Sequence, residues 1–227
     1  MHSLDQNLLS VQTRIATACS SANRSADAVR LIAVSKKHSS DSIRHIYQLG
    51  HRDFAENYLQ ESLHKIRALG DLAIQWHFIG PIQSNKTAAI AQHFQWVQSL
   101  DREKIAQRLN DQRPADMPAL NVCIQINLDA EQTKSGLPFT QAQSLANRIS
   151  CMPRLRLRGL MFIPAAQPNL EAKRQSCQRA ALYFQQLQRC FPSIDTLSLG
   201  MSADLEPAIE SGSTMVRIGT DLFGPRI

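Results

Sequence analysis

Short runs rich in apolar and β-branched residues alternate with amphipathic helical runs, and this alternation limits the fold more than any other feature. The β-rich runs predict strands at 30–36, 53–57, 74–79, 96–100, 120–127, 155–163, 196–200 and 215–219. Apolar residues at helical spacing predict helices at 3–22, 39–50, 59–69, 86–93, 102–111, 140–150, 169–190 and 203–210. Strands that alternate with helices are joined by right-handed crossovers, so the pattern predicts a parallel sheet.

The number of these units favours one of two parallel-sheet architectures. Eight strand–helix units within 227 residues match a compact (β/α)8 barrel, the TIM barrel, whereas a doubly wound open sheet is the alternative. We therefore expect an α/β fold: a single TIM barrel with an extra N-terminal helix over 3–22. No Pro-, Gly- or Ser-rich linker divides the chain, so residues 1–227 are predicted to form one domain. A hydrophobic content of 43% is ample for a buried core and argues against disorder.

Apolar runs and cysteines indicate the cellular compartment. The longest apolar runs span only a few residues, such as Leu31–Val34, so no membrane span is predicted. The N-terminus lacks the basic and apolar regions of a secretory signal. The five cysteines are odd in number and show no CxxC spacing, which argues against a disulfide framework or a zinc site. We expect reduced thiols in a cytoplasmic protein that binds no metal.

The net charge of +6 raises the question of an anionic partner. A nucleic-acid surface would combine cations with aromatic side chains. Arg154, Arg156 and Arg158 alternate along one predicted strand without such aromatics, so we expect them to form a solvated rim. A small anionic ligand, or an ordinary basic surface, explains the charge better than a nucleic acid, whose binding would weaken steeply with salt.

In a barrel the chemistry lies at the carboxyl ends of the strands, and Lys36 is the most informative residue there. Lys36 follows Ile32 and Val34 at strand period two, so all three are predicted to face the barrel interior. Partial burial lowers the pKa of a lysine and makes its amine nucleophilic, as bond formation with an aldehyde requires. The alternative is that Lys36 extends into water past the strand end, as we expect for Lys37.

Arg217 shares a strand face with Met215 and Gly219 on the last predicted strand. An arginine inside an apolar barrel strand needs a partner. That partner could be a carboxylate, such as Asp204 or Glu56, or an acceptor on a bound ligand. The two alternatives are equally compatible with the sequence.

Two glycine-containing strand ends suggest a phosphate site. Gly200–Asp204 contains Ser202 before a predicted helix, and Gly219–Thr220 follows the last strand. Phosphate sites in barrels commonly use the loops after strands seven and eight. The alternative is that Ser202 only caps its helix. His77 could act as a base, but a hydrogen-bonded core histidine is the better interpretation. The chain contains no P-loop, complete Rossmann fingerprint, HExxH or GxSxG motif.

These residues belong to an ordered set of motifs along nearly the whole chain. The set comprises Ala33–Lys36, Phe54–Glu61, Trp76–Gly80, Gln83–Lys86, Gln125–Asn127, Thr133–Gly136, Gly159–Met161, Gly200–Asp204, Val216–Thr220 and Phe223–Gly224. With these motifs the chain resembles the YggS/PROSC family of pyridoxal-phosphate-binding proteins, also called pyridoxal phosphate homeostasis proteins. That family in turn resembles the barrel domain of alanine racemase. Small departures occur, among them Asp221, where a small apolar residue is common.

The resemblance implies a role for each candidate residue. Lys36 would hold pyridoxal 5′-phosphate (PLP) as a reversible Schiff base. Arg217 would face the pyridine nitrogen, and His77 would lie near the mouth of the barrel. The remaining implied contacts are Ser202 with the backbone at Ile218, Gly219 and Thr220 for the phosphate, and Asn57 and Met161 along the cofactor.

The family role is buffering or delivery of PLP, and we expect no catalytic residue and no turnover. Arginine cannot accept a proton from the pyridine nitrogen, so the ring would be a weak electron sink. The alternative is a PLP-dependent amino-acid racemase, which needs a base on each face of its substrate. The chain as given ends at Ile227, and we expect no second domain to supply that base. Apo PLP-dependent enzymes are candidate partners, the resemblance favours a monomer, and Lys37 and Lys134 remain candidate secondary sites.

Overall fold

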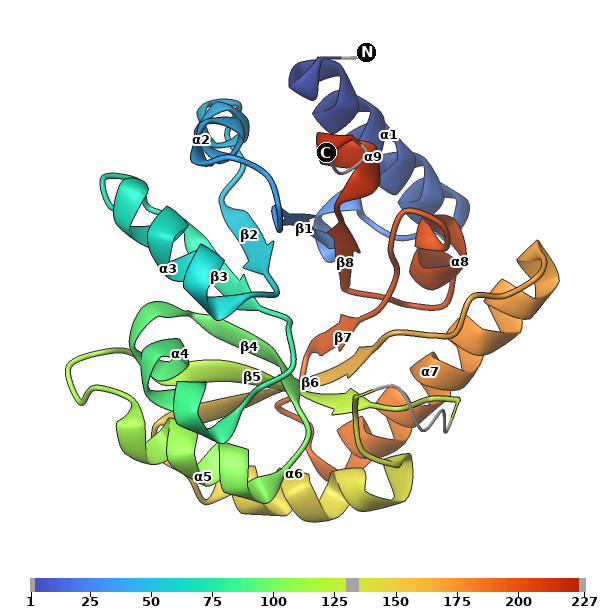
Figure 1. Ribbon diagram of the computed structural model, residues 1–227. Coiled ribbons are helices and arrows are strands. Elements are labelled where there is room, and N and C mark those ends of the chain that lie inside the picture. The colour runs from blue at the N-terminus through green and yellow to red at the C-terminus, as the bar shows by residue number, and fades with distance from the viewer. Residues whose placement is uncertain (1–2, 130–134, 225–227) are drawn as a thin grey trace.

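Eight parallel strands close around one axis, as Figure 1 shows for the computed structural model, which describes residues 3–129 and 135–224. Neighbours in the barrel follow chain order, and the last strand pairs with the first through Ile32 and Arg217. The strands are β1 (Arg30–Val34), β2 (Asp53–Glu56), β3 (Gln75–Phe78), β4 (Trp96–Leu100), β5 (Leu120–Ile126), β6 (Leu155–Phe162), β7 (Thr196–Ser198) and β8 (Met215–Ile218). The predicted TIM barrel is confirmed, and the open-sheet alternative is wrong.

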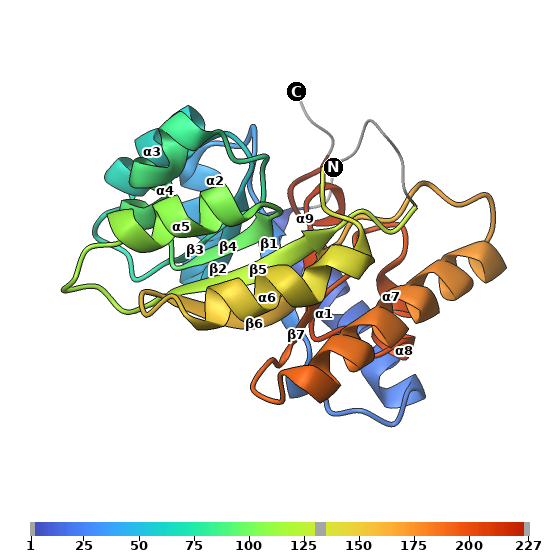
Figure 2. The same ribbon diagram turned by 90° about the horizontal axis from the view of Figure 1, so that it is seen from below.

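Helices form a ring outside the strands, and Figure 2 shows α6 along the outer side of β5 and β6. The α-helices are α1 (Leu4–Ser21), α2 (Ser40–Gln48), α3 (Leu59–Ala68), α4 (Thr87–His93), α5 (Glu103–Gln112), α6 (Ala142–Ser150), α7 (Leu170–Cys190), α8 (Leu205–Glu210) and α9 (Thr220–Phe223). Short 3₁₀ turns occur at Ala26–Ala28, Ser84–Lys86 and Phe139–Gln141. Across both described stretches, no helix combines the length and apolarity needed to cross a bilayer.

The extra N-terminal helix α1 completes this ring. Ser3 caps it with a capping box to Gln6, which satisfies backbone groups at its first turn. Its apolar face is buried and packs against α8, α9 and α2. Because only the short α9 follows β8 within the described chain, α1 takes the place of a barrel helix between α8 and α2 (Figure 1).

Two apolar layers lie on either side of the strands. Ile32 and Val34 belong to a small cluster inside the barrel, whereas Leu31 and Ala33 belong to the larger layer beneath the helices. This alternation confirms the inward direction predicted for the face that leads to Lys36. All five cysteines are free, and burial raises the pKa of Cys123 and Cys177 to about 12, so these two thiols stay protonated at neutral pH.

The prediction that Arg154, Arg156 and Arg158 form a solvated rim on the sixth strand is right for only two of the three. Arg154 and Arg156 are exposed. Arg158 lies on the same strand face but further along β6, and its side chain packs over Trp96 inside the barrel, with the guanidinium carbon 4.7 Å from the ring centroid. Arg158 also pairs with Asp195 at 2.6 Å. Alternation places Arg158 on the same face as Arg154 and Arg156, but it does not reveal where along the strand that face becomes enclosed by the barrel.

Candidate functional site

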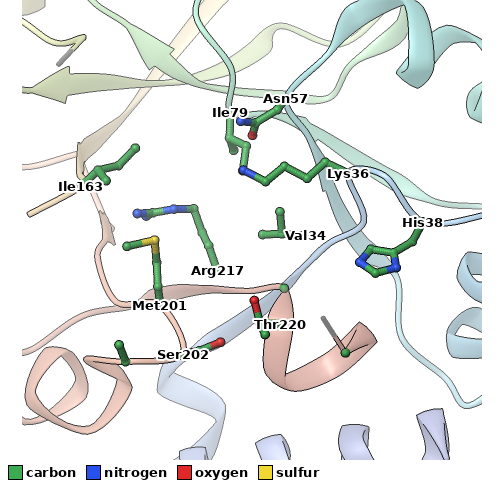
Figure 3. A pocket seen from close by; sticks show the side chains of 13 residues that line it. Val34, Lys36, His38, Asn57, Ile79, Ile163, Met201, Ser202, Arg217 and Thr220 are labelled. Atoms are coloured by element: carbon green, nitrogen blue, oxygen red, sulfur yellow. The ribbon is translucent and has the colours of Figure 1, made fainter. Parts of the chain in front are cut away.

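A cavity of about 330 Å³ opens at the carboxyl end of the barrel strands, where the fold predicts a site (Figure 3). Its walls come from the ends of β1, β2, β3, β6, β7 and β8. The residues that line it are Val34, Lys36, His38, Asn57, Ile79, Ile163, Met201, Ser202, Ala203, Arg217, Gly219, Thr220 and Gly224. Six of the eight predicted cofactor contacts are among them.

Lys36 reaches across this cavity. Strand β1 ends at Val34, two residues earlier than predicted, and the backbone N–H of Ser35 still donates to Ala55 in β2. Lys36 therefore lies in the turn directly after the strand. Figure 3 shows its amine directed toward Asn57 and Ile79. Its side chain is half-buried, so the alternative of a lysine extended into water is wrong for Lys36 and right for the exposed Lys37.

Arg217 is buried, with 3% of its surface exposed, yet it makes no ion pair with any described residue. Its guanidinium donates to the Ser198 hydroxyl at 2.6 Å and to the Phe162 carbonyl at 2.7 Å. The carboxylate partners considered from sequence, Asp204 and Glu56, are wrong, because both are engaged elsewhere. Burial lowers the pKa of Arg217 to about 10, so it remains cationic at neutral pH. A buried cation without a counter-charge fits an anionic or lone-pair ligand.

Two loops at one end of the cavity present unused hydrogen-bond donors. The hydroxyls of Ser202 and Thr220 lie at the same end of the cavity (Figure 3). Within the described chain, these backbone N–H groups have no acceptor: Ser202, Ala203, Gly219, Thr220 and Asp221. The two hydroxyls and these N–H groups, called the anion cup below, can surround a tetrahedral anion.

The capping alternative for Ser202 is wrong. Helix α8 begins at Leu205 rather than at Ala203, and Asp204 occupies its N-cap position without a side-chain cap. The Asp204 carboxylate instead accepts the N–H of Met201 at 2.7 Å and so shapes the loop. The Ser202 hydroxyl thus makes no hydrogen bond to any described residue, which leaves it available to a ligand.

Asn57 also offers an unused polar atom. Its Oδ1 is buried and has no hydrogen-bond partner in the described chain. Asn57 is held against the loop after β3, where a Cβ on Gly80 would lie 2.0 Å from the Asn57 carbonyl oxygen. Only glycine allows this close approach. A buried acceptor without a partner is costly, so Asn57 also fits a polar ligand.

Two predicted contacts do not line the cavity, and several lining residues were not predicted. Met161 is fully buried within the barrel, and Ile163 forms the wall after β6 instead. The side chain of Ile218 packs outward beneath the helices, and its backbone is not among the groups that form the anion cup. His38 lines the cavity without having been predicted, and it stacks on Phe223 with ring centroids 4.8 Å apart. The one sequence feature that indicates its place at the site is its position two residues beyond Lys36. Met201, Ile79 and Ile163 had none beyond their place at strand ends. Lys134 lies outside the described residues.

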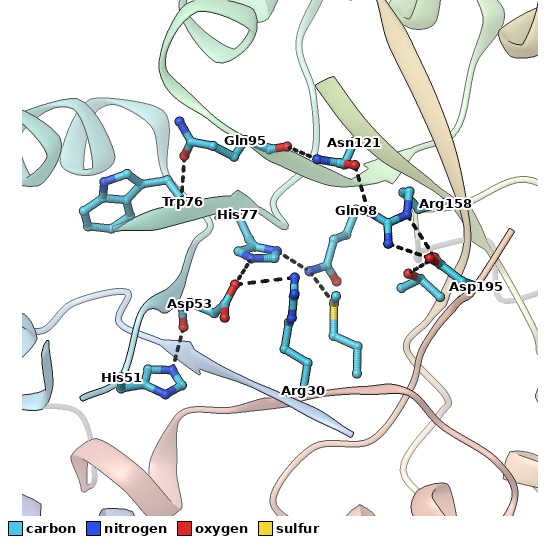
Figure 4. Close-up of polar contacts among 12 residues, drawn as sticks. Arg30, His51, Asp53, Trp76, His77, Gln95, Gln98, Asn121, Arg158 and Asp195 are labelled. Carbon is cyan, nitrogen blue, oxygen red and sulfur yellow. Dashed lines mark hydrogen bonds and ion pairs between the residues drawn. The ribbon is translucent and has the colours of Figure 1, made fainter. Parts of the chain in front are cut away.

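His77 lies away from the mouth, so the expectation that it would lie near it is wrong. The ring is fully buried and stacks on Trp96, the first residue of β4, at 5.3 Å (Figure 4). It contacts Asp53 at 3.0 Å and Gln98 at 3.0 Å. Because Asp53 and Trp96 are the first residues of their strands, His77 lies in the amino-terminal half of the barrel. The interpretation as a hydrogen-bonded core histidine is confirmed.

The residues present therefore fit a small ligand that carries both an aldehyde and a phosphate. Lys36 supplies an amine, the anion cup supplies donors for phosphate oxygens, and Arg217 supplies a buried donor between them. No described group of three or more His, Cys, Asp or Glu residues is placed to hold a metal ion.

Comparison with known proteins identifies the family. The model of the alanine racemase N-terminal domain matches residues 8–226. A pyridoxal phosphate homeostasis protein of Escherichia coli (strain K12) is 47% identical over 229 residues, covering 100% of this chain and 98% of its own. The protein of the same name from Pseudomonas aeruginosa is 50% identical over 226 residues, covering 100% and 97%.

Solved structures agree with this assignment. PipY of Synechococcus elongatus PCC7942, solved with PLP bound, superposes with a TM-score of 0.85 at 30% identity and covers 98% of this chain and 100% of its own. Alanine racemase of Clostridium difficile 630 shares the fold, with a TM-score of 0.78 at 14% identity, covering 97% of this chain and 56% of its own. The chain therefore belongs to the alanine racemase N-terminal domain family and, within it, to the pyridoxal phosphate homeostasis proteins.

Proposed function

We propose that this chain binds pyridoxal 5′-phosphate in the cavity at the barrel mouth, holds it through a reversible Schiff base on Lys36, and takes part in PLP homeostasis. One observation carries the proposal: the amine of Lys36, the unpaired cation Arg217 and the anion cup line one cavity. The relatives named for this role and the PLP-bound structure of PipY support it.

Each residue of the cavity has a distinct part in binding. The anion cup, with the hydroxyls of Ser202 and Thr220 and the neighbouring backbone N–H groups, holds the phosphate. Arg217 donates to the pyridine nitrogen, and its fixed proton keeps that nitrogen unprotonated. When bound, PLP supplies an aldehyde and an electron-accepting ring, and the arginine weakens the second property.

We further propose that binding, without turnover, is the function. Moving a proton between the two faces of a substrate requires an acid–base group on each face. Among the described lining residues, the titratable side chains are Lys36, His38 and Arg217. Lys36 and His38 leave the same loop, while Arg217 is held by Ser198 and Phe162. The wall made by Ile163, Met201 and Ala203 carries no titratable group.

We also propose a cellular compartment, an oligomeric state and partners for the protein. We place the protein in the cytoplasm as a one-domain monomer over residues 1–227 that buffers PLP or passes it to apo PLP-dependent enzymes. Nucleic acid and membrane are not among its proposed partners, because many exposed arginines pair with carboxylates, as Arg44 does with Asp71 and Arg174 with Glu210.

Titration with PLP tests the proposal. Wild-type protein should develop the visible absorbance of a protonated Schiff base and gain thermal stability with PLP concentration. Lys36→Ala should lose the absorbance, whereas Lys37→Ala, the control, should keep it. Absorbance retained in full by Lys36→Ala contradicts covalent binding at this residue. Deuterium uptake at the α-carbon of amino acids in D₂O would show turnover and support the racemase alternative.

A further inference from the structure

A second lysine, Lys65 of α3, lies buried beside the turn that carries Lys36. Only 5% of its surface is exposed. Its ammonium group donates to the carbonyl oxygen of Ser35 at 2.7 Å, to Glu56 at 2.7 Å and to Glu61 at 2.6 Å. An ammonium group has three donors, so these bonds use all of them.

The same group of residues holds the turn on both sides of Lys36. Ser35, before it, also donates from its hydroxyl to Glu56 at 2.7 Å. Lys37, after it, donates its backbone N–H to Glu61 at 2.5 Å. Lys65 joins the two carboxylates, so the residues that flank Lys36 are tied to one buried centre.

The backbone of this turn needs such support. Lys37 has a φ of +64°, a left-handed conformation that is uncommon for a residue other than glycine. Conformations of this kind persist where surrounding contacts hold them, and they gather at functional sites. Here Glu61 accepts the Lys37 N–H, and the backbone N–H of His38 closes the turn by donating to the Ser35 carbonyl at 3.0 Å.

The charged centre is also a poor way to stabilise a fold. Glu56 is fully buried, and its second oxygen has no hydrogen-bond partner among the described residues. Burial raises the pKa of Glu56, while Lys65 and Ser35 oppose this. Buried ion pairs often stabilise less than apolar side chains of similar size, so this centre calls for a role besides stability.

We propose that Lys65, with Glu56 and Glu61, is a positioning group that fixes the 35–37 turn and selects Lys36 as the lysine that bonds to the aldehyde of PLP. Lys65 itself is excluded, since its three N–H groups are bound to acceptors. Lys37 is excluded because its side chain is exposed and does not line the cavity. The inference rests on the proposed function, because it concerns how Lys36 is presented to that ligand.

The test separates bond formation from binding. Lys65→Met removes the ammonium group, and Lys104→Met on the exposed face of α5 is the matched control. One readout is the rate at which PLP becomes covalently bound to Lys36. Borohydride trapping at successive times and peptide mapping measure this rate. The other is affinity for pyridoxine 5′-phosphate, which has the phosphate and ring but an alcohol in place of the aldehyde. A group that only supports the fold would affect both readouts.

For Lys65→Met we expect covalent loading of Lys36 to slow about ten-fold or more, because a small misplacement of a reacting group is enough for such a loss. Affinity for pyridoxine 5′-phosphate should stay unchanged, and part of the trapped label should move to Lys37. A variant that loads Lys36 at the wild-type rate, or that loses both readouts equally, overturns the inference.

Glu61 provides a second test if Lys65→Met fails to fold, because its side chain is 28% exposed and tolerates change better. Glu61→Gln keeps an acceptor for the Lys37 N–H, whereas Glu61→Ala removes it. Loading should slow more in the alanine variant than in the glutamine variant, and equal wild-type rates in both contradict the inference. If the wild-type protein is itself not labelled at Lys36, the proposed function fails. If it is labelled but the variants match it, only the positioning role fails.

Discussion

The guanidinium of Arg217 donates a hydrogen bond of 2.6 Å to the hydroxyl of Ser198, whose own proton is donated to Gln98 at 2.6 Å. Gln98 continues this chain by donating from its amide nitrogen to His77 at 3.0 Å. The direction of Arg217 at the cavity is therefore fixed by polar groups inside the barrel rather than by a carboxylate.

The bond between Arg217 and Ser198 should be measurable as a coupling energy. A double-mutant cycle with Arg217→Met and Ser198→Ala should give about 1.5–3 kcal/mol in the free energy of unfolding, because one partner is charged. Urea unfolding of the four proteins provides the values. Strictly additive effects would show that Ser198 does not hold Arg217.

Gly80→Ala should destabilise the protein and disturb Asn57. The new Cβ would lie 2.0 Å from the Asn57 carbonyl oxygen, so the backbone must move, at a cost of about 1–3 kcal/mol. Gly70→Ala is the control, since the atom nearest to its Cβ is at 3.5 Å. Urea unfolding should show a loss for the first variant alone, and equal midpoints would contradict the close approach.

Stability should fall as the pH drops below about 6.5, the ordinary pKa of histidine. Burial lowers the pKa of His77 in the folded protein, although Asp53 opposes this, while Arg30 and His51 add to it. The unfolded chain therefore binds a proton at His77 before the folded protein does, and the free energy of unfolding decreases with falling pH. His77→Gln should reduce this slope without removing it, because burial also lowers the pKa of His51. An unchanged slope in the variant would contradict the account.

Arg14 should support phosphate binding specifically. From α1 it contacts Glu206 at 2.8 Å, Asp221 at 2.5 Å and the Ser202 carbonyl at 3.1 Å, and so joins both loops of the anion cup. Arg14→Met should weaken PLP binding about five-fold, the equivalent of about 1 kcal/mol for a partly exposed ion pair. Affinity for pyridoxal, which lacks the phosphate, should not change.

Arg174→Met, which removes another partly exposed ion pair with Glu210, serves as the control for Arg14→Met. Equal losses for PLP and pyridoxal in the Arg14 variant would show a general effect on the fold rather than on the anion cup.

The barrel and the place of its site could be predicted from sequence because they follow from local periodicity. Strand period two places Ile32 and Val34 on the inner face, as the structure confirms, and Lys36, in the turn after the strand, lines the same cavity as Val34. The partners of Arg217 could not be predicted, because Ser198 and Phe162 approach it through barrel closure between β6, β7 and β8.

Other predictions that the structure contradicts also depended on contacts between residues distant in the sequence or on the course of a loop. Arg158 lies further into the barrel than Arg154 and Arg156, where it packs over Trp96. Asp204 accepts the Met201 N–H and α8 starts only at Leu205, which leaves Ser202 free of a capping role. His77 was placed at the mouth by resemblance alone, whereas its contacts with Asp53 and Trp96 put it in the opposite half of the barrel.

We propose that Lys36 is the residue to which PLP bonds. Borohydride reduction of the PLP-loaded protein, followed by peptide mass mapping, tests it most directly. We predict one modified residue, Lys36, and loss of that modification in Lys36→Arg with the fold retained. Label on Lys37, Lys104 or other lysines while Lys36 stays unmodified would contradict the account.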